Sequence, residues 1–276
     1  MRKYTALAAL LFPVLAGSLL IAAAQRHPST PAQQEKMPVG TIGPISTIRP
    51  APAGYHYRNG EVLHYTTDWR LWSAGTATLR LDQAGSEEKV SATADSIGFA
   101  ALLYTVQDRL QAYFNPRTFC SSRIDKHSEE GLHKRDTHIV FNYARHKAVL
   151  DERNLRDNET KHTENDIPGC VSDVLSGIFY LGSLPLTVGS TYHFPINDGG
   201  KTVDVSAYVE AREDVKTGAG TFHTVRVQPS APAGVLKNRG KVWIWYTDDS
   251  AHLPVQIRAR LFWGTLTFQL SRVDRQ

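Results

Sequence analysis

The chain has 276 residues, of which 31 are Lys or Arg and 27 are Asp or Glu, so its formal net charge is +4 at neutral pH. Two of the basic residues, Arg2 and Lys3, precede an apolar run, and without them 29 basic residues face 27 acidic ones. These residues are scattered along the chain, whereas a nucleic-acid-binding protein concentrates its basic residues on one face. The charge balance therefore excludes nucleic acid as a partner.

The first 24 residues have the pattern of a secretory signal peptide. An apolar run from Tyr4 to Ala24 follows the two basic residues and ends in three alanines suited to cleavage. We expect the protein to be exported. An uncleaved anchor is the alternative, since about 20 apolar residues can span a bilayer. Only in that case would the protein be attached to a membrane, because no cysteine near the cleavage point offers a site for lipid.

Residues 25–54 are rich in proline and poor in aromatic residues. Such a segment cannot bury enough apolar surface to offset the entropy lost on ordering. We therefore predict a disordered leader or linker, followed by one β-rich domain over residues 55–276.

Alternation of apolar and polar residues, which is typical of half-buried strands, dominates this domain. It begins at residues 61–70 and 76–81, which predict a hairpin. Further alternating runs lie at residues 89–96, 105–114, 135–143, 191–196, 202–210, 221–228, 241–247, 254–261 and 265–270, with weaker ones at 117–126 and 146–153. Most neighbours are joined by short turns. The prediction is a mainly β fold: one antiparallel meander of about a dozen strands, forming a curled sheet or half-barrel that protects its edges.

Two short helices interrupt the meander. In residues 170–183 the apolar residues recur at helical spacing, with Asp173 in the first turn and Gly182 near the end. A second helical piece is expected between Ile97 and Tyr104. The longer helix is expected either to cover the open mouth or concave face of the sheet, or simply to complete the core.

The stretch VWIWYTDD at residues 242–249 is apolar on both faces of a strand. Trp243 and Trp245 share one face, while Val242, Ile244 and Tyr246 share the other. A strand with water on one side alternates with polar residues, so we expect this strand to be covered on both sides. Asp248 and Asp249 then point to opposite faces and are expected to begin a turn.

An apolar face of this kind lines the interior of small β-barrels that hold hydrophobic ligands. The candidate lining residues of such a cavity are four aromatic side chains: Trp69, Trp243, Trp245 and Phe268. A solid core is the alternative.

The chain has two cysteines, Cys120 and Cys170. An even number in an exported protein favours a disulfide, which would close a long loop, over two buried thiols.

The sequence shows no catalytic motif and no sign of a cofactor. Its eleven histidines form no HxH or HExxH pattern, so we predict no metal site. It has no GxSxG elbow, and its Asn-Asp-Gly-Gly segment is typical of a hairpin turn rather than a phosphate loop. Asp108 is unusual because it shares a strand face with apolar residues. We expect it to be structural and paired with a residue such as an arginine on a neighbouring strand, with a functional acid as the alternative.

Three stretches resemble the uncharacterised exported-protein family DUF3108, domain of unknown function 3108. They are GEVLHYTTDWRLWSAGTATL at residues 60–79, NDGGKTVDVSAYVEAREDVKTGAGTFHTVRVQP at 197–229 and WYTDDSAHLPVQI at 245–257. The resemblance covers nearly all of residues 55–272. It implies a β domain located in the periplasm or cell envelope of a bacterium, without an accepted activity or catalytic residues. A looser likeness to the half-barrels that carry lipoproteins in the bacterial envelope concerns the fold only.

Three hypotheses for function follow. The first is a non-catalytic envelope protein that binds a hydrophobic or amphiphilic ligand. The second is a structural or interaction protein of a cell-envelope assembly, with another envelope protein as its partner. The third is an enzyme whose site, involving Asp108 or the Asp248–Asp249 pair, the sequence does not reveal.

Overall fold

The computed structural model describes residues 46–50, 52, 55, 58–70, 72–231, 240–261 and 264–275. The predicted signal peptide and most of the predicted leader lie outside the described residues. Residues 46–50 lie against the β-rich domain, where the backbone N–H of Arg49 donates a hydrogen bond to the Tyr180 hydroxyl over 3.2 Å.

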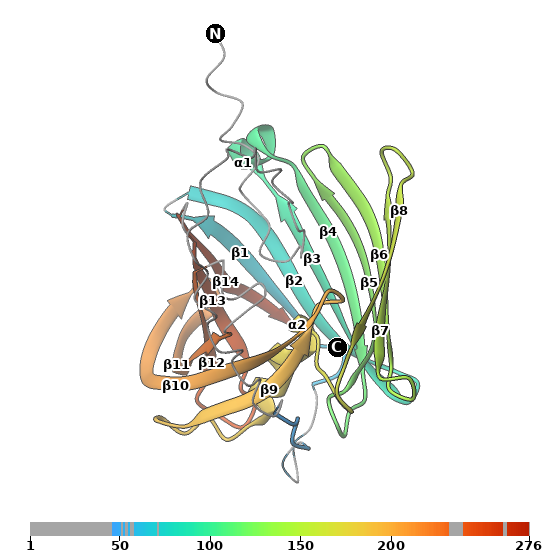
Figure 1. Ribbon diagram of the computed structural model, residues 1–276. Helices are drawn as coiled ribbons and strands as arrows, with labels where there is room; N and C mark the ends of the chain where they lie inside the picture. Colours follow the sequence, from blue (N-terminus) through green and yellow to red (C-terminus); the bar gives the residue numbers. More distant parts are fainter. Residues whose placement is uncertain are drawn as a thin grey trace, which may run out of the picture.

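Fourteen strands and two helices make up the described fold (Figure 1). The strands are β1 (Val62–Trp69), β2 (Trp72–Ala84), β3 (Glu87–Ser96), β4 (Val106–Phe114), β5 (Ser121–Glu130), β6 (His133–Asn142), β7 (Lys147–Asn154), β8 (Thr160–Asp166), β9 (Thr191–Asn197), β10 (Thr202–Thr217), β11 (Gly220–Ser230), β12 (Lys241–Thr247), β13 (Pro254–Leu261) and β14 (Gly264–Asp274). The helices are α1 (Gly98–Leu103) and α2 (Val174–Ser183).

All fourteen strands belong to one antiparallel sheet, in the order β8-β7-β6-β5-β4-β3-β2-β1-β14-β13-β12-β11-β10-β9. Every neighbour follows along the chain except β1 and β14, which join the first strand of the meander to the last. The sheet curls without closing, because β8 and β9 remain its two edges. The predicted meander with short helices is confirmed.

Side chains from the two edges meet without forming a strand ladder. Asn165 on β8 donates a hydrogen bond to the Gly199 carbonyl over 2.8 Å, and Asn197 on β9 donates to Asn165 over 2.7 Å. Gly199 has a φ of 90° and no room for a side chain, since an added Cβ would lie 2.6 Å from Ile139 Cδ1. This turn between β9 and β10 therefore packs on the inner face of β6 and is hydrogen-bonded to the edge strand β8.

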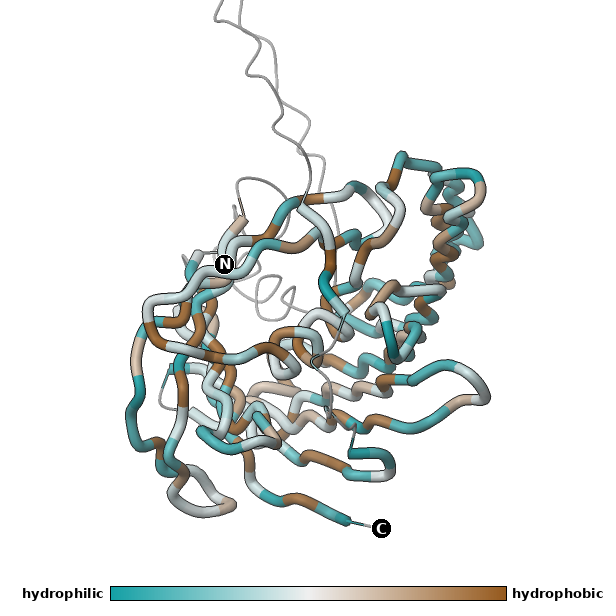
Figure 2. Tube along the Cα trace, turned by 90° about the horizontal axis from the view of Figure 1, so that it is seen from below, coloured by the Kyte–Doolittle hydropathy of each residue, from teal (hydrophilic) through white to brown (hydrophobic). Residues whose placement is uncertain are grey.

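Helix α2 lies inside the curl and its contacts hold the core together. Asp173 caps the helix by accepting hydrogen bonds from the backbone N–H groups of Leu175 and Ser176. Tyr180 on α2 makes edge contacts with Phe119 and Phe194, at ring-centroid distances of 5.2 and 5.0 Å. Seen from below, hydrophobic and hydrophilic positions alternate along the strands (Figure 2), as expected for a sheet with one face toward a core.

The described residues contain no helix with the length and apolar character needed to cross a membrane. The disulfide between Cys120 and Cys170 is present, with a Cα–Cα distance of 5.1 Å. It joins the turn before β5 to the segment that leads into α2, as the count of cysteines predicted.

Candidate functional site

An apolar cavity of about 170 Å³ lies between α2 and the sheet. Its walls come from α2 and from the inner faces of β1–β3 and β9–β14. The lining includes Tyr65, Ala92, Gly177, Ile178, Ile244, Ala259 and Phe268. An engineered apolar cavity of about 150 Å³ stays dry and binds benzene, so this space admits a ring or a short piece of an acyl chain.

Strand β12 contributes to this cavity with the face opposite its tryptophans. Val242 and Ile244 line the cavity, and the Tyr246 hydroxyl donates to the Ile178 carbonyl of α2 over 2.8 Å. Trp245 faces outward, where its indole N–H donates to Glu213 Oε1 over 2.6 Å beneath the Arg258 guanidinium. Both faces of this strand are therefore covered near its end, as predicted, and Asp248 and Asp249 enter the expected turn.

The structure separates the four predicted lining residues. Phe268 lines the cavity. Trp243 and Trp245 lie on the outer face of β12, and Trp69 lies partly buried at the end of β1 beneath the Arg70 guanidinium, outside the cavity wall. Small residues that the sequence analysis did not single out, such as Ala92 and Gly177, line the cavity instead. Their small size leaves the space open.

Asp108 is buried on the inner face of β4, with 1% of its surface exposed. Burial of the Asp108 carboxyl is the main cause of its raised pKa, which is about 7. The Lys126 ammonium opposes that rise, and the nearby Glu130 carboxyl adds to it. The sequence analysis expected a partner such as an arginine on a neighbouring strand, and the cation in this balance is Lys126 of the neighbouring strand β5. Arg109 donates to the backbone carbonyl of Asp108 over 2.8 Å. Alternation turns the Arg109 side chain to the outer face.

The buried carboxyl gives a testable pH dependence. The folded pKa of Asp108, about 7, lies above the ordinary value of 3.8, so the folded state binds more protons between these values. We expect this group to lower the free energy of unfolding as pH rises from about 4 to about 7. Asp108→Asn should therefore be more stable than wild type above pH 7 in urea unfolding, with the difference shrinking toward pH 4. An unchanged difference across this range would contradict the assignment.

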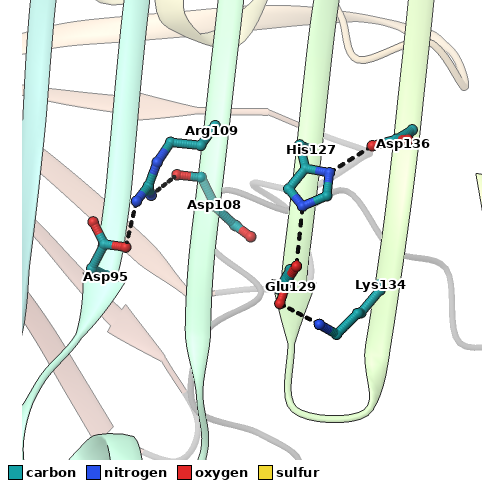
Figure 3. A network of polar contacts seen from close by, with 7 residues as sticks. All are labelled: Asp95, Asp108, Arg109, His127, Glu129, Lys134 and Asp136. Carbon is teal, nitrogen blue, oxygen red and sulfur yellow. Dashed lines mark hydrogen bonds and ion pairs between the residues drawn. The ribbon is translucent and has the colours of Figure 1, made fainter. Parts of the chain in front are cut away.

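The outer face of β4–β8 carries a polar trough of about 690 Å³. Figure 3 shows polar contacts on this face, in which His127 meets both Asp136 and Glu129. Three histidines each bond an aspartate on a neighbouring strand: His127 with Asp136, His138 with Asp125 and His162 with Asp151, over 2.6 to 2.7 Å. The hydrogen bond that the His127 ring donates to Asp136 is the main cause of the raised pKa of His127. Within the part of the chain that the structure describes, no three His, Cys, Asp or Glu side chains are arranged to hold a metal ion.

One end of the sheet exposes large apolar side chains. Helix α1 buries none of its residues, and Phe99 and Leu102 are 73% and 84% exposed. Trp72 at the start of β2 and Leu132 in the turn after β5 are similarly exposed. Backbone hydrogen bonds from Ile97 to Ala74 and from Gly131 to Thr105 hold these segments together. We refer to this surface, made by Trp72, Phe99, Leu102, Leu103 and Leu132, as the apolar rim.

The fold and cavity define a curled-sheet β protein with a helix inside it and an apolar pocket between the two. The chain belongs to the family described as protein of unknown function (DUF3108), whose model matches residues 64–271. No curated protein matches the chain.

Among solved structures, the chain is similar to a β-barrel-like protein of domain of unknown function DUF1849 from Brucella abortus. The identity is 7% and the TM-score 0.53, over 78% of this chain and 96% of that one. This likeness concerns the fold alone.

Two weaker matches have identities of 11% and 12%. One is a protein from Bacteroides fragilis described as exported and of YmcC-like fold, with a TM-score of 0.35 over 83% of this chain and 99% of that one. The other is a protein from Parabacteroides distasonis described as a lipoprotein, with a TM-score of 0.30 over 78% and 95%. At these TM-scores neither contributes to the structural interpretation.

Proposed function

We propose that this protein is a non-catalytic exported protein of the bacterial cell envelope that binds a hydrophobic or amphiphilic ligand in the cavity beneath α2. The observation that carries the proposal is the cavity itself, enclosed by apolar side chains from α2 and the sheet. Ligand pockets are concave and mostly apolar, with few polar groups. The secretory signal pattern and the disulfide favour an exported protein.

The position of the cavity suits an exchange with a hydrophobic environment. Its lining reaches the ends of β11, β12 and β13 through Pro229, Val242 and Leu261. Strand pairing places these strand ends at the same end of the sheet as the β1–β2 turn and α1. The cavity thus lies in the half of the domain that carries the apolar rim.

A matched pair of variants tests the cavity. Ala259→Phe should fill it, because Ala259 is buried and lines the space, whereas Trp243→Ala changes the opposite face of the same pair of strands. We expect Ala259→Phe to weaken binding of octan-1-ol about tenfold or more, since about 1.4 kcal/mol of lost apolar contact has that effect. Trp243→Ala should bind as wild type does.

Isothermal titration calorimetry measures both affinities, and circular dichroism shows that both variants are folded. Equal binding by wild type and a folded Ala259→Phe would contradict the cavity as the binding site.

The apolar rim favours a second candidate, an interaction protein of an envelope assembly. Exposed aromatic and aliphatic side chains that gather on one surface mark interaction sites. A photo-crosslinking residue at Leu102 should then capture one reproducible envelope protein in cells, and the same residue at Tyr208, on β10, should not. Absence of a specific product at Leu102 would count against this candidate.

A further inference from the structure

A group of charged side chains lies on the inner face of the sheet beside the cavity. Asp108 shares this face with the buried Val106 and Leu110 of β4. Register places Lys126 and Glu130 of β5 opposite these two neighbours. Arg135 of β6 and Glu152 of β7 follow on the same face, 3.7 Å apart. We refer to Asp108, Lys126, Glu130, Arg135 and Glu152 as the inner charged cluster.

The cluster begins one strand away from the cavity wall. Ala92 of β3 lines the cavity and pairs with Leu110, and the next inward residue, Ala94, pairs with Asp108. Directly opposite residues on one face have Cβ atoms about 4.5–5.5 Å apart. Asp108 therefore lies one strand and one inward position away from Ala92 on the cavity wall.

The Asp108 carboxyl has an acceptor that nothing satisfies. Its Oδ1 atom is buried and finds no hydrogen-bond partner among the described residues. The hydrogen bonds that this carboxyl shares with the Glu130 side chain and the Glu129 backbone therefore involve its other oxygen. A buried acceptor left without a donor is unfavourable and rare in folded proteins. The cluster comprises three carboxylates and two cations. The other titratable groups that face it are His133, exposed at the start of β6, and Tyr104, which ends α1 before β4.

The cluster has one carboxylate more than it has cations, and one buried acceptor without a donor. A ligand with one positive charge and N–H donors would supply both the missing charge and the missing donor. We propose that the inner charged cluster binds the head of the amphiphile and that this head carries a protonated primary amine, which donates to Asp108 Oδ1. This inference rests on the proposed function, because the amphiphile's chain occupies the cavity.

Proton and ammonium compete for the same carboxyl. Since burial raises the pKa of Asp108 to about 7, the carboxyl is mostly protonated at pH 6 and mostly ionised at pH 8. An alkylamine keeps its charge at both values, because a primary amine such as that of Lys has a pKa of about 10.4. Amine binding should therefore strengthen with rising pH, whereas alcohol binding should not change.

The test uses octylamine and octan-1-ol, which share one chain length and differ in the head. At about pH 8 we expect calorimetry to show that octylamine binds about tenfold or more tightly than octan-1-ol. A charge-assisted hydrogen bond between the ammonium and Asp108 accounts for a difference of this size. The preference should fall below about threefold at about pH 6 and in Asp108→Asn. Asp125→Asn, which removes a carboxylate from the outer face of β5, is the control and should keep the preference.

Each outcome has a distinct meaning. Equal binding of amine and alcohol by wild type at pH 8, or an amine preference that survives in Asp108→Asn, would overturn the assignment while leaving the cavity intact. Binding of neither probe would overturn the proposed function as well. If Asp108→Asn does not fold, Glu130→Gln, which alters the neighbouring carboxyl, takes its place. Loss of the amine preference in Glu130→Gln would support the cluster as the site of the head.

Discussion

Replacing Cys120 and Cys170 together by serine is expected to lower the free energy of unfolding by about 4 kcal/mol. The disulfide closes a loop with a sequence separation of 50, which contains β5–β8, and so limits the freedom of the unfolded chain. For a domain of this size, such a loss lowers the melting temperature by roughly 8–16 °C. Calorimetric melting of the oxidised wild type and the double variant measures it.

The effect should be reproduced by reduction of the wild type, because both treatments open the same loop. A reduced wild type that melts with the oxidised protein would show that the bridge contributes nothing. The single variant Ser122→Ala, next to the same turn, controls for local changes, since the partly buried Ser122 hydroxyl makes one hydrogen bond, to the Tyr113 carbonyl.

Asp173→Ala is expected to lower the free energy of unfolding by about 3 kcal/mol or more. The buried carboxylate accepts hydrogen bonds from two backbone N–H groups of α2, at 2.8 and 3.0 Å, and from the hydroxyls of Ser121 and Ser176. Alanine leaves all four donors without this acceptor in a region with little access to water. Urea unfolding measures the loss.

Asp173→Asn separates the cap from the charge. The amide oxygen still accepts from the helix backbone, so we expect this variant to lose only about 1 kcal/mol. Equal losses for alanine and asparagine would indicate that the negative charge, rather than the cap, stabilises this end of α2.

Local patterns in the sequence were sufficient to predict most of the fold. Strand alternation and turn residues predicted the meander, and helical spacing with Asp173 predicted α2. Strand β8 was missed because its sequence, TKHTEND, is polar at nearly every position. An edge strand with both faces near solvent has no apolar alternation to reveal it. The fourteen strands of the described residues exceed the predicted dozen partly for this reason.

The binding site was less accessible to sequence reasoning. The two apolar faces of β12 predict that both are covered, but the pattern does not tell which face meets α2. Bulky tryptophans fill space, and the cavity instead borders small residues such as Ala92, Gly177 and Ala259. Asp108 was recognised as unusual from its apolar neighbours. That Lys126 and Glu130 lie near it became clear only from the register of β4 and β5.

Native mass spectrometry of residues 25–276, purified gently from an exporting bacterial host, tests the central claim most directly. We expect a discrete added mass on the oxidised wild type that extracts into organic solvent and is absent from Ala259→Phe, because the filled cavity has no space for the ligand. A bare mass for the wild type, or the same added mass on a folded Ala259→Phe, would contradict a ligand in the cavity beneath α2.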